Sequence, residues 1–298
     1  MHIIFQLDLI LTIQQTTKKR KPEWLLKKVF FAQQKDVEIA LKDIGIHTVC
    51  QEAKCPNMSE CFSKKLATFM ILGSTCTRAC SYCNVDTGMP SGIDEKEPQK
   101  VADAVVSLGL KHVVITSVTR DDLKDGGAQQ FVKCVKAIKD MDESITVELL
   151  IPDLQYDEKA LSDVANCGAE VVGHNMETVP RLYSVRKGAN YKKSLGVLKS
   201  LKKANPKLKT KSAFMLGLGE NEDELKTSLQ DLLDVECTLL TMGQYLAPSK
   251  AHAEVVEYIN PKKFEEYGEL ALEMGFEFVK SSPYTRSSYM AHEYFDEK

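Results

Sequence analysis

The chain has 298 residues, of which 43% are hydrophobic, and 39 basic against 42 acidic residues give a formal net charge of -3. This length suits a single α/β barrel and is long for one β-sandwich or helical bundle. The near balance of charge argues against binding through bulk electrostatics to nucleic acid, so we expect no nucleic-acid partner.

The N-terminus carries a short apolar run that Gln6 and Asp8 interrupt. The run is too short to span a bilayer, and neither a basic region before it nor a small-residue cleavage site marks a signal peptide. The basic run at 18–21 has the composition of a solvated surface segment. We therefore predict a disordered tail over 1–20, no membrane partner and a cytoplasmic location.

Residues 21–66 are predicted to form an N-terminal extension. Apolar residues at helical spacing run from Val37 to Ile44, and Gly45 follows where a helix would end. A loop then carries a first group of three cysteines with the spacing C-x4-C-x5-C, namely Cys50, Cys55 and Cys61.

Strands and helices are predicted to alternate over 67–260. The apolar run 67–73 indicates a buried strand, and a second group of cysteines, Cys76, Cys80 and Cys83, follows it with the spacing C-x3-C-x2-C. Further strands are expected at 112–118, 145–151, 170–173, 209–218 and 237–245, with helices between them at 101–108, 131–138, 158–165, 195–201 and 225–233.

The helix over 225–233 has a predicted capping box at Asn221 and Glu224, and Asn260 with Pro261 opens a last helix. Six strands separated by helices indicate a parallel sheet, either doubly wound or curled into a barrel. Polar residues gather at the predicted carboxyl ends of the strands, where both architectures place an active site.

The six clustered cysteines can be read in two ways. Three thiolates at C-x3-C-x2-C spacing can bind three irons of a [4Fe-4S] cluster and leave the fourth iron open. A closed zinc site is the alternative, but zinc sites usually pair two C-x-x-C knuckles and only one is present. The other cysteines, Cys134, Cys167 and Cys237, are predicted to pack in the core.

The second cysteine group, with Tyr82 before its last member, resembles the signature of the radical S-adenosylmethionine superfamily. The whole stretch 52–90 resembles the lipoyl synthase family, as do VTRDDLKDGGA at 118–128, GHNMETV at 173–179, MLGLGE at 215–220 and the segment 245–264. A C-terminal R-S-S-Y motif at 286–289 matches the same family, although Ser282 stands where we expect glycine.

This resemblance implies a partial (β/α)6 barrel over 67–260 with a C-terminal helix and R-S-S-Y extension over 261–298. It implies two [4Fe-4S] clusters. The first, on Cys76, Cys80 and Cys83, would bind and cleave S-adenosylmethionine to a 5'-deoxyadenosyl radical. The second, an auxiliary cluster held by Cys50, Cys55, Cys61 and Ser288, would be consumed as the sulfur source.

Further site residues follow from the same resemblance. Gly217 and Gly219 would belong to the S-adenosylmethionine pocket, and Asn175 and Glu177 are predicted to contact the same cofactor from their positions at the mouth of the barrel. Glycine after a strand is also a common turn former, and the polar residues Asp121, Asp122, His174, Asn175 and Glu177 could instead cap helices.

The implied reaction is the insertion of two sulfur atoms at C6 and C8 of a protein-bound octanoyl-lysine. The implied partners are an octanoylated lipoyl carrier domain, from a 2-oxoacid dehydrogenase E2 or a glycine cleavage H protein, and an electron donor such as ferredoxin or flavodoxin. Two alternatives stay open. One is another radical sulfur inserter, such as a biotin synthase or a methylthiotransferase, and the other is a non-catalytic metal-binding module.

Overall fold

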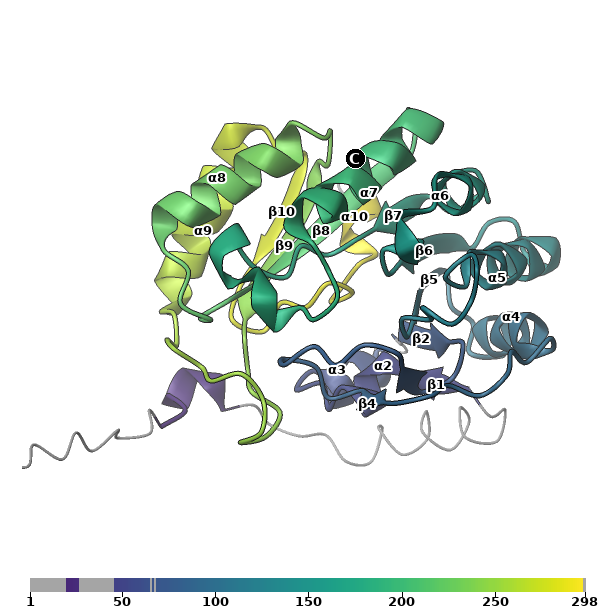
Figure 1. Ribbon diagram of the computed structural model, residues 1–298, viewed down its shortest axis with the longest axis horizontal. Helices are drawn as coiled ribbons and strands as arrows, with labels where there is room; N and C mark the ends of the chain where they lie inside the picture. Colours follow the sequence, from purple (N-terminus) through teal and green to yellow (C-terminus); the bar gives the residue numbers. More distant parts are fainter. Residues whose placement is uncertain (1–19, 27–45, 65, 67, 297–298) are drawn as a thin grey trace, which may run out of the picture.

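The computed structural model describes residues 20–26, 46–64, 66 and 68–296 (Figure 1). The predicted helix over 37–44 and almost all of the predicted tail lie outside these residues. At the start of the described part, Leu25 is buried at the end of η1 (Glu23–Leu25).

One eight-stranded sheet forms the centre of the molecule, and its strands are neighbours in chain order. Every pairing is parallel except that of β1 with β2, which is antiparallel. In order across the sheet, the strands are β1 (His47–Thr48), β2 (Thr68–Ile71), β5 (His112–Ser117), β6 (Thr146–Leu150), β7 (Val171–Gly173), β8 (Lys209–Leu216), β9 (Leu239–Gln244) and β10 (Phe278–Ser281).

Six long helices connect these strands and lie on the outer face of the curved sheet (Figure 1). They are α4 (Glu97–Ser107), α5 (Ala128–Met141), α6 (Glu158–Ala165), α7 (Tyr191–Ala204), α8 (Glu222–Leu233) and α9 (Pro261–Met274). Consecutive strand order with right-handed crossovers puts all helices on one face, whereas a doubly wound sheet reverses its order and has helices on both. The structure therefore selects the partial barrel.

The predicted strands and helices are confirmed within a few residues at their ends. The capping box of α8 is present: the Glu224 backbone N–H donates to the Asn221 side chain at 2.9 Å, and the Asn221 N–H donates to the Glu224 carboxylate at 2.9 Å. Asn260 caps α9. Each contact satisfies a backbone donor that the first turn of a helix leaves free.

The apolar core lies mainly between the sheet and its outer helices. One cluster of buried side chains joins β2, β5 and β6 to α4, α5 and α6, and a second joins β8 and β9 to α7, α8 and α9. Cys134 and Cys237 are fully buried and Cys167 packs at the edge of the first cluster, so all three lie in or against the core as predicted.

Smaller elements surround the two cysteine groups. In the N-terminal part they are α2 (Val49–Glu52), α3 (Met58–Ser63), β3 (Thr75–Cys76) and β4 (Asp86–Thr87). Further along are η2 (Leu154–Tyr156), η3 (Pro180–Val185) and α10 (Glu293–Asp296). The sequence did not predict β1, β10 or α10. The strand β10 adds to β9 and so brings the C-terminus to the edge of the barrel.

Candidate active site

The second cysteine group lies in a loop just beyond the carboxyl end of β2, as predicted. Segments from distant parts of the chain hold this loop in place. The Ser81 N–H donates to the Val185 carbonyl at 2.9 Å, and the Ser81 carbonyl accepts from the Ala253 N–H at 2.7 Å. The ring nitrogen Nε2 of His252 lies 3.0 Å from the Cys83 carbonyl oxygen. The loop conformation is thus fixed by the barrel rather than by its own short sequence.

The cysteine loop faces a cavity of about 210 Å³ at the carboxyl ends of the strands. Side chains from β2, β5, β6 and the loops beyond β6 and β7 line it. They include Cys76, Cys80, Cys83, Tyr82, Met70, Val118, Ile151, Asp153, Asn175, Glu177 and Arg186. The three predicted ligands of the first cluster therefore share one cavity with Asn175 and Glu177, two of the four predicted S-adenosylmethionine contacts.

The surroundings of these thiols act on the thiolate form in opposite directions. Cys76 Sγ accepts backbone N–H groups from Arg78 at 3.4 Å and from Thr119 at 3.3 Å, and such bonds stabilise a negatively charged sulfur. Burial raises the pKa of Cys80 and raises that of Cys83 to about 11. Since ligands must be deprotonated, cluster binding at this loop is coupled to proton release.

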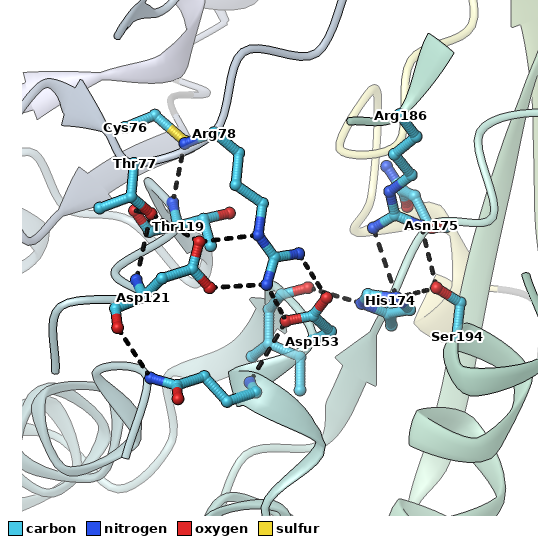
Figure 2. Close-up of polar contacts among 12 residues, drawn as sticks. Cys76, Thr77, Arg78, Thr119, Asp121, Asp153, His174, Asn175, Arg186 and Ser194 are labelled. Atoms are coloured by element: carbon cyan, nitrogen blue, oxygen red, sulfur yellow. Dashed lines mark hydrogen bonds and ion pairs between the residues drawn. The ribbon is translucent and has the colours of Figure 1, made fainter. Parts of the chain in front are cut away.

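Arg78, between the first two cysteines of the loop, contacts two carboxylates from two neighbouring strand ends (Figure 2). Its guanidinium donates to Asp121 from Nε at 2.9 Å and from Nη2 at 2.6 Å. It also donates to Asp153 from Nη1 at 2.5 Å and from Nη2 at 3.0 Å. Asp153 is almost fully buried. Because the planar guanidinium donates two hydrogen bonds to each carboxylate, these contacts fix the orientation of the loop in addition to attracting it through opposite charge.

A second polar group surrounds His174 at the carboxyl end of β7 (Figure 2). Burial, with a smaller contribution from nearby Arg186, lowers the pKa of His174 to about 3, so the ring is neutral. His174 Nδ1 lies 3.0 Å from the Ile151 carbonyl oxygen, and Arg186 donates to Nε2 at 3.3 Å. The proton of the neutral ring is therefore on Nδ1.

Arg186 connects His174 to the residues that line the cavity. It donates to the backbone carbonyl of Asn175 at 2.5 Å, and Asn175 Nδ2 donates to Glu177 Oε1 at 3.1 Å. Burial raises the pKa of Glu177 although Arg186 opposes the shift. Glu177 also has a positive φ of 68°, a strained conformation for a residue with a side chain.

The polar candidates at the strand ends do not cap helices. Asp121 binds Arg78, and Asp122 binds Arg120 with an oxygen 2.7 Å from its Nη2. The α5 helix, which follows both aspartates, has Gly127 at its N-cap, and the η3 helix beyond Glu177 has Val179 there.

Gly217 and Gly219 are not among the residues that line the cavity. Gly217 has a φ of 103°, and a Cβ there would lie 2.3 Å from Gln244 Nε2 and 2.4 Å from the Glu257 carbonyl oxygen. Close packing against the segment after β9 explains this glycine. Contacts of Gly217 and Gly219 with S-adenosylmethionine stay predictions.

The first cysteine group meets the R-S-S-Y motif in a second, smaller pocket. Cys50, Cys61 and Ser288 line it together, with Thr68, Leu66, His112, Val114, Ala291 and His292. Cys55 interacts electrostatically with Cys50 and with Arg286 of the motif. The structure thus brings the predicted serine next to cysteines more than two hundred residues away.

We name residues 282–292 the C-terminal arm, because this segment reaches from the barrel to the first cysteine group. Asn57 Nδ2 donates to the Tyr284 carbonyl at 2.6 Å, and the Tyr289 hydroxyl donates to Glu60 at 3.0 Å. Ser282, where we expected glycine, is not among the described residues with positive φ. Its hydroxyl lies 2.8 Å from that of Thr285, so the turn accepts a serine.

The donor sets fit [4Fe-4S] clusters. One site offers three thiolates, and the other offers the thiolates of Cys50 and Cys61 with the Ser288 hydroxyl. Cys55, the third predicted ligand of the auxiliary cluster, is not among the residues that line the second pocket. Within the described part of the chain, no three His, Cys, Asp or Glu side chains surround one point as they would around a single metal ion. A cubane cluster does not need such convergence because each thiolate binds a different iron.

Comparison with known proteins identifies the family. The Radical SAM superfamily profile matches residues 70–232. The lipoyl synthase of Geotalea daltonii is 51% identical over 275 residues, covering 92% of this chain and 94% of that protein. The lipoyl synthase of Caldicellulosiruptor saccharolyticus is 51% identical over 276 residues, covering 92% of this chain and 97% of the relative. The chain belongs to the lipoyl synthase family.

Solved structures support the fold of this lipoyl synthase family member. Methylornithine synthase (PylB) aligns with a TM-score of 0.55 at 13% identity, over 83% of this chain and 81% of that one. Streptococcus suis SuiB bound to S-adenosylmethionine aligns with a TM-score of 0.57 at 9% identity, over 84% of this chain and 60% of that one. These similarities confirm the radical S-adenosylmethionine type of partial barrel.

Membership of the lipoyl synthase family confirms the predicted class of enzyme, a radical sulfurtransferase that uses [4Fe-4S] clusters and S-adenosylmethionine. It excludes the alternative of a non-catalytic metal-binding module. In the described part of the chain, no helix is both long and apolar enough to cross a bilayer.

Several residues of the site were missed from the sequence. Arg78 could have been noticed as a charged residue between two predicted ligands, and Asp153 as an acid directly after a predicted strand. Arg186 carries no such local signal, because it lies between a predicted strand and the next predicted helix, and only the fold brings it to His174 and Asn175.

Proposed function

We propose that this chain inserts two sulfur atoms, at C6 and C8, into an octanoyl-lysine on a lipoyl carrier domain. The observation that carries the proposal is the meeting of Ser288 with Cys50 and Cys61 beside the barrel that holds Cys76, Cys80 and Cys83. One molecule then has a radical source and a sulfur source within reach of one substrate chain.

In this proposal, Cys76, Cys80 and Cys83 hold the first cluster, which when bound supplies the electron that cleaves S-adenosylmethionine. The protein contributes position and exclusion of water. The loop contacts of Arg78 and His252 fix the cysteines, and the apolar side chains of Met70, Val118 and Ile151 line the cavity in which a radical would form. An unactivated methylene has no acidic proton, so no side chain need act as a base.

Cys50, Cys55, Cys61 and Ser288 hold the auxiliary cluster in this proposal, and that cluster is the sulfur-donating substrate. A serine oxygen is a hard ligand among soft thiolates, so it should release its iron more readily than a fourth cysteine would. Ser288 is partly exposed, as a ligand of a cluster that is taken apart must be. The proposal assigns this chemistry to the extensions 21–66 and 261–298, and radical formation to the barrel over 67–260.

The carrier domain of a 2-oxoacid dehydrogenase E2 or of a glycine cleavage H protein is the proposed substrate, and ferredoxin or flavodoxin the proposed reductant. The chemistry sets these classes. The octanoyl group must reach the cavity on a lysine arm, and the first cluster needs one electron for each S-adenosylmethionine cleaved. We propose a cytoplasmic location, where such partners occur.

The deciding experiment uses the full chain, reconstituted under anaerobic conditions. It is incubated with an octanoyl-lysine peptide, S-adenosylmethionine and dithionite, and the peptide is analysed by mass spectrometry. We expect products with one and two added sulfur atoms and about eight irons per chain before turnover. An unmodified peptide from fully loaded protein would contradict the proposal, and about four irons would remove its auxiliary site.

A further inference from the structure

The hydroxyl of Ser287, next to the proposed ligand Ser288, points away from the auxiliary pocket toward the cavity of the barrel. It donates a hydrogen bond to Asn175 Oδ1 at 3.0 Å. Asn175 lines the cavity that contains Cys76, Cys80 and Cys83, whereas Ser288 lines the pocket that contains Cys50 and Cys61. The bond therefore connects the two sites directly.

The other side of Asn175 is held so that its side chain has one orientation. Its Nδ2 donates to Glu177 at 3.1 Å, and its backbone carbonyl accepts from Arg186 at 2.5 Å. With the amide nitrogen committed to a carboxylate, the amide oxygen is left to accept from Ser287. Arg186 is anchored in turn by the buried His174. A rigid polar chain thus runs from the cavity wall to the arm.

The arm has a further contact on each side of Ser287. Before this residue, the Gln244 N–H donates to the Pro283 carbonyl at 3.2 Å, and after it Tyr289 binds Glu60. The first contact ties the arm to β9 and the second to α3. Between these two contacts, the hydrogen bond from the Ser287 hydroxyl to Asn175 joins the arm to the wall of the cavity.

We propose that Ser287 is a positioning residue that couples the S-adenosylmethionine cavity to the arm carrying the auxiliary-cluster ligand. This inference rests on the proposed function. Sulfur insertion requires that the substrate carbon, once it loses a hydrogen atom in the cavity, lies beside the sulfur donor. A fixed arm keeps these two positions in register, while a loose arm allows S-adenosylmethionine to be cleaved without sulfur transfer.

Thermodynamic linkage gives the coupling a second consequence. If a ligand in the cavity stabilises Asn175 and Glu177, it also stabilises the docked arm, and the docked arm strengthens ligand binding by the same factor. S-adenosylmethionine should therefore slow backbone hydrogen exchange over 284–292. This effect should need the Ser287 hydroxyl, and it can be measured without any turnover.

The test compares Ser287→Ala, Ser287→Thr and Ser282→Ala in reconstituted full-length protein. Ser282 is the matched control because it is a serine of the same arm whose hydroxyl hydrogen-bonds to Thr285 within its own turn. Two quantities are measured for each protein. One is the ratio of 5'-deoxyadenosine formed to sulfur inserted in the octanoyl-lysine peptide, and the other is the protection of 284–292 from exchange on adding S-adenosylmethionine.

We expect Ser287→Ala to raise the ratio about five-fold, the effect of losing one neutral hydrogen bond, and to abolish the added protection. Ser287→Thr, which keeps the hydroxyl, and Ser282→Ala should behave as the wild type. An unchanged ratio in Ser287→Ala would overturn the inference, and so would loss of auxiliary iron in that variant, since Ser287 would then serve cluster retention. A wild-type protein that inserts no sulfur would instead overturn the proposed function.

Discussion

At the scale of single residues, the two cysteine groups are chemically similar, but replacing a cysteine of one group should remove different products from replacing a cysteine of the other. Cys55→Ala should still form 5'-deoxyadenosine, because Cys76, Cys80 and Cys83 remain, but it should give no thiolated product. Cys80→Ala should give neither. Chromatography of the nucleoside and mass spectrometry of the peptide measure both products. Radical formation that survives in Cys80→Ala would show that the two groups have been assigned the wrong way round.

Arg78 provides a test of the ion pairs that orient the cysteine loop. Removing it leaves Asp153, whose side chain is 1% exposed, as a buried charge without its partner. Arg78→Met should therefore destabilise the protein by about 3–5 kcal/mol. Arg181→Met is the matched control. Arg181 pairs with Glu224, but the Arg181 side chain is 55% exposed, and such exposed ion pairs contribute at most about 1 kcal/mol to the free energy of unfolding. Equal falls in Tm for the two variants would refute this role.

The same pair predicts a pH dependence of stability. Burial alone would raise the pKa of Asp153, but the hydrogen bonds and attraction from Arg78 outweigh it and lower the pKa below 3.8. A lowered pKa in the folded state adds stability above the unfolded value, and this stability is lost as the pH falls through the folded value. In Arg78→Met the buried carboxyl has lost this partner, so its protonation on acidification relieves an unpaired buried charge. Between pH 6 and about pH 3, Tm should therefore fall more steeply in wild type than in Arg78→Met, measured by thermal unfolding in a pH series. A shallower fall in wild type would contradict the assignment.

At the scale of elements, the contact between the C-terminal arm and β9 depends on Gly243, which has no side chain. A Cβ at Gly243 would lie 1.9 Å from the Thr285 carbonyl oxygen, so Gly243→Ala should displace the arm. We expect iron after reconstitution to fall from about eight toward about four per chain, because Ser288 moves with the arm. Iron and acid-labile sulfide assays measure this directly.

Gly196→Ala is the control for that prediction. Gly196 lies inside α7, and a Cβ there would meet nothing within 4 Å. Alanine should stabilise the helix by about 1 kcal/mol and leave the iron content unchanged. If Gly243→Ala keeps its full iron content, the prediction is wrong, and the arm holds the auxiliary site without its contact with β9.

The elements also show how far the sequence could lead. The six predicted strands are apolar runs with helices of regular period between them, and local pattern alone determines both. By contrast, β10 is a short strand whose residues are all half-buried, so its composition carries little signal. The meeting of Asn57 with Tyr284 depends on how the chain returns to the sheet, which no local pattern encodes. The family motif predicted the partner Ser288, but not its geometry.

At the scale of the whole molecule, the C-terminal segment also closes the interior of the barrel. Lys211 on β8 and Glu148 on β6 form an ion pair of 2.5 Å with both side chains 1% exposed. Tyr294 of α10 hydrogen-bonds to the same ammonium group, whose nitrogen lies 4.5 Å from the ring centroid. A polar cluster thus joins two strands of the barrel to the end of the chain.

This arrangement was only partly predictable. Lys211 lies in a strand that is buried on both faces, where a charged side chain requires a partner. The sequence does not say which acid supplies the partner, because Glu148 is 63 residues away and its strand pairs with β5 and β7 rather than with β8.

The ion pair between β6 and β8 predicts the cost of leaving one buried charge without its partner. Lys211→Met should lose about 3–5 kcal/mol of folding free energy, because Glu148 stays buried without the Lys211 ammonium group and keeps the more distant His112 ring, 3.7 Å away, as a neighbour. The double variant Lys211→Met with Glu148→Gln should recover most of this loss, since no charge then remains inside. Denaturant unfolding of the three proteins measures both terms. If the double variant is less stable than the single one, then Tyr294 and the fit of the side chains, rather than the paired charges, hold the end of the chain in the barrel.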